Sequence, residues 1–194
     1  MKNNVPALSL ALTLLALSAC SPDREKPIDD AVVETGATTS AEPSQSEMIP
    51  PDYDTAVLRL EGLGDLTIGK SIPAGSTWAV RGAQVSETCQ TASSPDYPGA
   101  YAIVSGNSVR RITISDDSDV KLTEGIAPGA TEEEVMTEFP GFTASPHKYV
   151  DAPAKYLTQP GDDPRLRFEI ESNGKVSLVH VGVMPELGYV EGCA

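Results

Sequence analysis

The stretch from Arg165 to Val183 reads RLRFEIESNGKVSLVHVGV and contains two apolar segments separated by a turn signal. In its first part, apolar and charged residues alternate, which is the pattern of a strand with one buried and one solvated face. Asn173-Gly174 is a strong signal for a hairpin turn. The second part is apolar on both faces and predicts a central strand. This stretch therefore predicts an antiparallel sheet in the C-terminal half of the chain.

An earlier part of the chain shows the same pattern of two apolar segments on either side of a turn signal. AYAIVSG (Ala100–Gly106) and VRRITIS (Val109–Ser115) flank Asn107-Ser108 and predict a second hairpin. SETCQTAS, residues 86–93, predicts a further strand. The segment from Ser145 to Gln159 is broken by prolines and predicts one irregular edge strand.

One helix is predicted with clear ends. Thr131 and Glu134 stand at capping-box spacing, and two further glutamates between them complement the helix N-terminal dipole. Pro140-Gly141 ends the helix. A weaker counterpart follows Gly69, where proline and glycine allow only a short helix.

These elements predict an α+β fold with an antiparallel sheet and one or two short helices. Each glycine-containing helix start is followed by a hairpin, so the pattern suggests two tandem helix-hairpin units, over residues 57–118 and 119–194. We expect residues 51–194 to form a single globular α+β domain, whose core lies between the sheet and the helix.

The N-terminus carries a targeting signal. Lys2 precedes an apolar run from Val5 to Leu17, which is too short to cross a bilayer stably. Leu17-Ser18-Ala19-Cys20 resembles the lipobox of bacterial lipoproteins. The resemblance implies that residues 1–19 are a signal peptide and that Cys20 becomes the lipidated N-terminal residue. An ordinary signal peptide, cut after Ala19 and leaving an unmodified cysteine, is the alternative.

The same resemblance bears on location. Ser21 stands where an aspartate would signal retention in the inner membrane. The lipobox reading therefore implies a lipid anchor in the cell outer membrane, with the protein facing the periplasm. Several acyl chains give stable attachment where a single one is marginal.

A linker follows the anchor. Residues 20–50 are acidic, rich in proline, serine and threonine, and contain no aromatic residue. Such a segment cannot bury enough apolar surface to offset its ordering entropy, so we expect a disordered tether between the membrane and the domain.

Charge limits the class of partner. The chain has 28 Asp and Glu against 14 Lys and Arg, a formal net charge of −14. Nucleic-acid binding is disfavoured because phosphate contacts need clustered basic residues. A basic partner or a divalent cation would be attracted, although high charge also serves plain solubility.

The cysteines fit an oxidising compartment. If Cys20 carries lipid, Cys89 and Cys193 remain as an even pair, and we predict that they form a disulfide. Two free thiols are the alternative. No further cysteine or nearby histidine completes a structural zinc site, so no metal site and no cofactor are predicted.

The glycine-hydroxyl pattern, the acidic helix start and the hairpins together resemble a known module. Ile68–Ser71 and Pro128–Val135, with the hairpins, resemble the SmpA/OmlA outer-membrane lipoproteins, and the tandem form resembles the β-lactamase-inhibitor-protein fold. Pro146–Tyr149 (PHKY) and Tyr189–Cys193 (YVEGC) are similar to segments of uncharacterised bacterial envelope proteins. The chain departs from the inhibitor family because its one available disulfide joins the halves instead of lying within each.

Candidate chemistry is sparse. The chain has two histidines, of which His147 lies in a predicted loop and His180 in a predicted strand, where a structural role is the default. With a carboxylate between them they would form a metal site. No Gly-x-Ser-x-Gly, phosphate-loop or His-Glu-x-x-His motif occurs.

Two weaker candidates remain. Asp116, Asp117 and Asp119 can offer oxygen ligands to Ca²⁺, but the glycine and distal glutamate of an EF-hand are missing, which favours a solvated loop. Trp78 is either an exposed binding anchor or a core residue.

These observations predict a membrane-anchored periplasmic binding or assembly lipoprotein without enzymatic activity, whose partner is a protein of the envelope. One alternative is a small-ligand or metal-binding protein, or a hydrolase, that uses His147 or His180. Another is an inhibitor of a basic enzyme that attacks the envelope.

Overall fold

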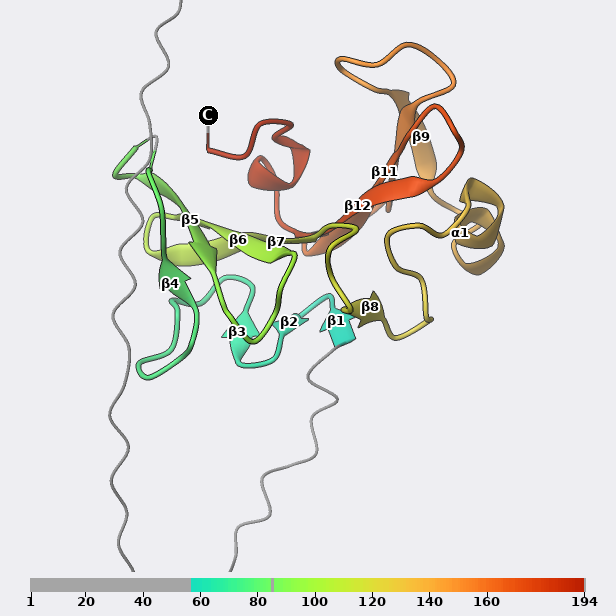
Figure 1. Cartoon of the computed structure of the whole chain (residues 1–194). Coiled ribbons are helices and arrows are strands. Elements are labelled where there is room, and N and C mark those ends of the chain that lie inside the picture. The colour runs from blue at the N-terminus through green and yellow to red at the C-terminus, as the bar shows by residue number, and fades with distance from the viewer. Residues whose placement is uncertain (1–56, 85, 194) are drawn as a thin grey trace, which may run out of the picture. The chain divides into compact units, whose positions relative to one another are not determined.

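The structure, a computed structural model, describes residues 57–84 and 86–193 (Figure 1). The predicted signal peptide, Cys20 and the tether lie outside the described residues. The described chain forms twelve strands, which are arranged in one sheet of eight strands and one of four.

The larger sheet is antiparallel throughout, in the order β4-β5-β6-β7-β12-β11-β10-β9. Its strands are β4 (Ala79–Val80), β5 (Cys89–Ser93), β6 (Ala100–Ser105), β7 (Ser108–Ile114), β9 (Thr143–Pro146), β10 (Lys155–Thr158), β11 (Arg165–Ile170) and β12 (Val176–Gly182). β4 to β7 form one half of this sheet, and β9 to β12, which come later in the chain, form the other half. The central contact is the pairing of β7 with β12.

The smaller sheet has the order β3-β2-β1-β8. Its strands are β1 (Val57–Arg59), β2 (Gly62–Leu63), β3 (Leu66–Thr67) and β8 (Lys121–Leu122). β1 pairs antiparallel with β2 and parallel with β8, so this sheet joins segments from the two halves of the chain. In Figure 1 it lies on one side of the larger sheet.

The expected α+β class with tandem helix-hairpin units is wrong: the fold is all-β. Among the described residues there is one short α-helix, α1 (Glu132–Glu138), besides the single 3-10 turn η1 (Glu186–Gly188). The segment after Gly69 forms no helix, because Gly69 and Gly75 adopt left-handed backbone with φ of 80° and 82°. Its backbone instead exchanges hydrogen bonds with Val109 of β7, which tie the two sheets together.

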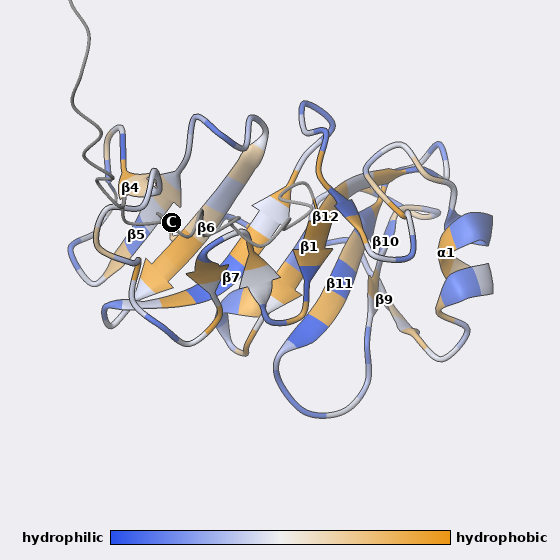
Figure 2. Ribbon diagram, turned by 90° about the horizontal axis from the view of Figure 1, so that it is seen from below, coloured by the Kyte–Doolittle hydropathy of each residue, from blue (hydrophilic) through white to orange (hydrophobic). Residues whose placement is uncertain are grey.

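The predicted helix start is confirmed. Thr131 is the N-cap of α1, and its side chain accepts a hydrogen bond from the Glu134 amide while the Glu134 carboxylate accepts one from the Thr131 amide. Val135 is fully buried. Figure 2 shows the apolar side of α1 turned toward the larger sheet and its hydrophilic side turned outward.

Both predicted hairpins form, with turns that differ in detail from the expectation. β6 and β7 are joined by Gly106 and Asn107, both at positive φ, so this two-residue turn begins one residue earlier than predicted. In the second hairpin, Glu171 pairs with Lys175 and Gly174 has a φ of 75°, which gives a three-residue loop. The predicted strand near Cys89 is β5. The proline-broken segment forms parts of two strands, β9 and β10.

The two faces of the larger sheet differ. One face carries the core, in which Phe168, Ile112, Val179 and Val181 are fully buried under the smaller sheet and α1. The alternating bands of β11 in Figure 2 follow this division. We call this side the core face and the opposite side the polar face.

The C-terminal segment, residues 184–193, crosses the polar face over β7 and β6. Arg111 of β7 is 1% exposed and donates hydrogen bonds to the backbone carbonyls of Glu186 and Tyr189. Arg110 adds an ion pair with the Glu186 carboxylate at 3.3 Å. Figure 1 shows this segment on the side of the sheet opposite β1–β3.

A disulfide joins Cys89 of β5 to Cys193, as the cysteine pairing predicted, with 5.4 Å between the Cα atoms. The two cysteines are 104 residues apart in the sequence. The bond therefore fixes the end of the chain to the first half of the sheet.

Replacing both Cys89 and Cys193 by serine will lower the free energy of unfolding by about 2–4 kcal/mol, because the unfolded chain loses a long covalent loop. Urea unfolding with and without reductant measures the effect. Reductant should lower the midpoint of the natural chain and leave that of the double variant unchanged. Equal midpoints for the two oxidised proteins would contradict this expectation.

Candidate functional site

The polar face brings both histidines together. His180 of β12 lies between Thr113 of β7 and Arg167 of β11 in the strand register. Glu169, two residues further along β11, faces the same side and pairs with Tyr156 of β10. His147 follows β9 and reaches Glu169 from the edge of the sheet.

His147 has both ring nitrogens occupied. Its Nδ1 accepts hydrogen bonds from the backbone amides of Tyr149 and Val150 at 3.1 and 3.0 Å. Nδ1 is therefore unprotonated in the neutral ring, so Nε2 carries the proton and donates it to Glu169 Oε1 at 2.7 Å. The ring stacks on Tyr156 with 4.8 Å between centroids. This histidine closes the turn that follows β9.

His180 lies deeper. Its Nδ1 is 2.9 Å from the Thr113 hydroxyl, and its Nε2 is 3.8 Å from Glu169 Oε2. Burial lowers the pKa of His180 to about 4, and the neighbouring Glu169 offsets only part of that effect. Burial alone would raise the pKa of Glu169, but contacts with His180 and His147 outweigh it and keep that pKa below its usual value. The cluster thus holds an ionised carboxylate between the neutral ring of His180 and the Nε2–H group of His147.

The hydroxyl, imidazole and carboxylate groups follow one another in the same order as in a hydrolytic triad. A catalytic triad needs a nucleophile that substrate can reach, however, and the hydroxyl here is buried. Thr113 is fully buried and His180 is 4% exposed. A hydroxyl with no access to substrate cannot act as a nucleophile. The Thr113–His180–Glu169 arrangement is therefore a buried polar network that fixes the strands.

The suggested metal site does not form from these residues. Within the part of the chain that the structure describes, no group of three or more His, Cys, Asp or Glu side chains has the geometry to hold a metal ion. The carboxylate lies between the two imidazoles, accepts a hydrogen bond from His147 and is 3.8 Å from His180 Nε2, so the three side chains do not converge on a common point.

The structure also places the remaining binding candidates, which are Trp78 and the three aspartates. Trp78 is 2% exposed and stacks on Tyr97 at 5.5 Å, so it belongs to the core and offers no exposed anchor. Asp116, Asp117 and Asp119 lie on the exposed loop between β7 and β8. Nothing in the structure brings further ligands to that loop.

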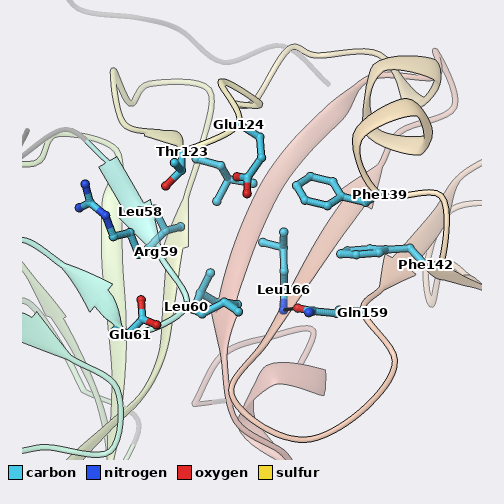
Figure 3. A pocket seen from close by; sticks show the side chains of 12 residues that line it. Leu58, Arg59, Leu60, Glu61, Thr123, Glu124, Phe139, Phe142, Gln159 and Leu166 are labelled. Carbon is cyan, nitrogen blue, oxygen red and sulfur yellow. Dashed lines mark hydrogen bonds between the residues drawn. The ribbon is translucent and has the colours of Figure 1, made fainter.

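A cleft on the core face was not predicted. It lies between the smaller sheet and the C-terminal end of α1, and has a volume of about 280 Å³ (Figure 3). Leu58, Leu60 and Leu122 line it from the smaller sheet and its flanks, and Phe139 and Phe142 line it from the end of α1. Leu166 and Val181 of the larger sheet complete the apolar part.

The aromatic side of the cleft forms one cluster. The rings of Phe139 and Phe142 are 5.0 Å apart, and both contact Phe168 of β11 at centroid distances of 5.7 and 5.8 Å. Phe168 is fully buried, whereas Phe139 and Phe142 are half-buried. The Pro140-Gly141 turn brings the two phenylalanines side by side, whereas the sequence pattern predicted only a helix end there.

The rim of the cleft is polar and carries more negative than positive charge. Figure 3 shows Arg59, Glu61 and Glu124 around the opening, with Gln159 on the far side. A second depression shares Glu124 and is lined by acidic residues of α1, among them Glu133 and Glu138. The cleft and this acidic patch adjoin at Glu124.

The chain matches no protein-family model, and no curated protein and no solved structure is significantly similar to it. The resemblance to SmpA/OmlA lipoproteins thus depends on the sequence motifs alone. In the described residues, no helix combines the length and the apolar character needed to cross a bilayer.

The buried histidine predicts acid sensitivity. Because the folded pKa of His180 lies near 4, below its ordinary value of about 6.5, the unfolded chain binds a proton first as pH falls. The free energy of unfolding should therefore drop by up to about 3 kcal/mol between about pH 7 and about pH 4. Glu169 adds a further loss, which begins as pH falls through its ordinary pKa of 4.5 in the unfolded chain and is complete only below its lowered pKa in the folded chain.

Urea unfolding across this pH range measures the loss, and His180→Gln should remove most of it. A His180→Gln variant with the unchanged pH dependence would contradict the assignment. If that variant does not fold, an NMR titration of the His180 ring in the natural chain decides: a pKa near 6.5 would refute the proposed burial effect.

Proposed function

We propose that this chain is a lipid-anchored lipoprotein of the bacterial outer membrane that faces the periplasm and binds a protein partner without catalysing a reaction. The lipobox resemblance and the acidic linker support the location. The observation that carries the binding role is the aromatic-lined cleft, which leaves apolar side chains of the core face open to a partner. Clefts of this kind, with an apolar base and a few polar groups, are the usual binding sites of proteins.

The polar face supports a role without catalysis. The only histidines are held in a buried network whose hydrogen bonds are internal to the fold. A general base needs a ring nitrogen that is free to take the proton of its substrate, whereas His180 is 4% exposed and both ring nitrogens of His147 are engaged in hydrogen bonds within the fold. The alternative of a histidine-dependent hydrolase or ligand-binding protein is therefore less well supported.

A second candidate function, inhibition of a basic envelope-attacking enzyme, is favoured by one observation. The rim of the cleft and the neighbouring face of α1 are acidic. Such a surface speeds association with a basic protein. The identity of the captured partner distinguishes this candidate from a role in envelope assembly.

Photo-crosslinking in living cells tests the binding role. A photoreactive residue replacing Thr123, on the rim of the cleft, should capture a specific envelope protein. The same residue replacing Val80, which is exposed at the opposite edge of the larger sheet, is the control and should not. Absence of any specific product at position 123 would count against the proposal.

Mass spectrometry of the natural protein tests the anchor. We expect a mature chain that begins at Cys20 with a diacylglyceryl group on sulfur and an acyl group on its amine. A chain that begins at residue 20 with an unmodified thiol, or that keeps its leader, would refute the lipid anchor.

A further inference from the structure

We infer that the cleft binds a single large apolar side chain, of leucine or phenylalanine size, from a partner segment that carries lysine or arginine beside it. This inference depends on the proposed function, because it assumes that the partner is a protein. It specifies the chemistry that the partner must have.

The size of the cleft points to a side chain. Its volume of about 280 Å³ lies at or below the lower end of the range for sites that enclose drug-sized ligands, roughly 300–1,000 Å³. One leucine or phenylalanine side chain with part of its backbone fills such a space. Anchors of this kind, inserted into a desolvated pocket, supply much of the binding energy at protein interfaces.

The lining favours an apolar anchor. Phe139 and Phe142 are half-buried, so each keeps part of its ring accessible from the cleft. Covering this surface stabilises a complex by about 25 cal/mol for each Å² removed from water. The apolar base formed by Leu58, Leu166 and Val181 offers no hydrogen-bond partner to a polar side chain.

The rim favours a cation next to that anchor. Glu61, Glu124, Glu133 and Glu138 are exposed, and no ion pair involves any of them among the described residues. The remaining acidic groups of α1 are already engaged: Glu132 with Lys155 at 2.7 Å, and Glu134 in the helix cap. Arg59 is the one basic residue that lines the cleft, so negative charge is in excess.

Other occupants fit less well. A second copy of this chain has a formal net charge of −14 and would be repelled by an acidic rim. The carboxylate of a fatty acid would meet Glu61 and Glu124 as well as Arg59. A segment of another protein with one apolar and one basic side chain matches both the apolar lining and the acidic rim.

A displayed random-peptide library tests the inference. The full mature chain, held by its own anchor in phosphatidylcholine nanodiscs, is used for selection, and empty nanodiscs serve for counter-selection. We expect the enriched peptides to share one leucine, isoleucine or phenylalanine within a few residues of lysine or arginine. Decanoate and the isolated chain itself, monitored by its oligomeric state, serve as competing probes.

The consensus peptide is then measured against paired variants. Its affinity should fall at least tenfold in Phe142→Ser, which removes the apolar wall, and several-fold in Glu124→Lys, which reverses a rim charge. Val80→Ser and Glu87→Lys make matching changes at exposed positions near the opposite edge of the larger sheet and should bind as the natural chain does. If Phe142→Ser does not fold, Leu60→Asp on the opposite wall replaces it.

The outcomes separate this inference from the proposed function. Failure to enrich any peptide, enrichment without basic residues, or binding that ignores both cleft variants would overturn the inference. So would decanoate binding or self-association through the cleft in place of peptide binding. In each case a specific crosslink from position 123 to an envelope protein would leave the proposed function standing, and its absence would remove that as well.

Discussion

The antiparallel pairing of β7 with β12 is the contact on which the rest of the molecule depends. It joins β4–β7 to β9–β12, and so makes one sheet with two different faces. Gly182 permits this pairing at its end, because a Cβ there would collide with the backbone of Arg110 and Arg111. On the core face the pair buries Ile112 beside Val181, and on the polar face it sets His180 beside Thr113. A shift of one residue in the pairing of β7 with β12 would exchange the two faces and place the charged side chains in the core.

The two faces are covered in different ways, and the difference produces the sites. On the polar face the C-terminal segment covers β7 and β6, held by Arg111 and the disulfide from Cys89 to Cys193. The histidine network occupies the remaining strands, where Glu169 and Thr113 contact the two imidazole rings. On the core face the smaller sheet and α1 each cover part of the strands. Neither reaches the other completely, and the cleft is the uncovered seam between them.

This division explains why the histidines and the tryptophan do not line the cleft. A histidine or tryptophan draws attention because of its chemistry, yet His180 and Trp78 are among the most buried side chains here. Burial of His180 beside Thr113 and Glu169 lowers the pKa of its ring and, in this fold, makes the arrangement of the strands sensitive to acid. The accessible apolar surface instead comes from Phe139 and Phe142, which a sequence pattern assigns to an ordinary amphipathic helix end.

The sequence alone determined the features that depend on neighbouring residues. Apolar segments on either side of a turn signal specified both hairpins, the Thr131–Glu134 spacing specified the helix start, and cysteine pairing specified the disulfide. The all-β class, the seam between the two covers and the meeting of His147 with Glu169 were decided only in the tertiary structure. They depend on which strands pair across long stretches of chain, and on positive-φ glycines such as Gly69 that divert a segment from helix into sheet contacts. Periodicity within a short window carries no information on either, because the free energy of such pairings comes from burial between residues far apart in the chain.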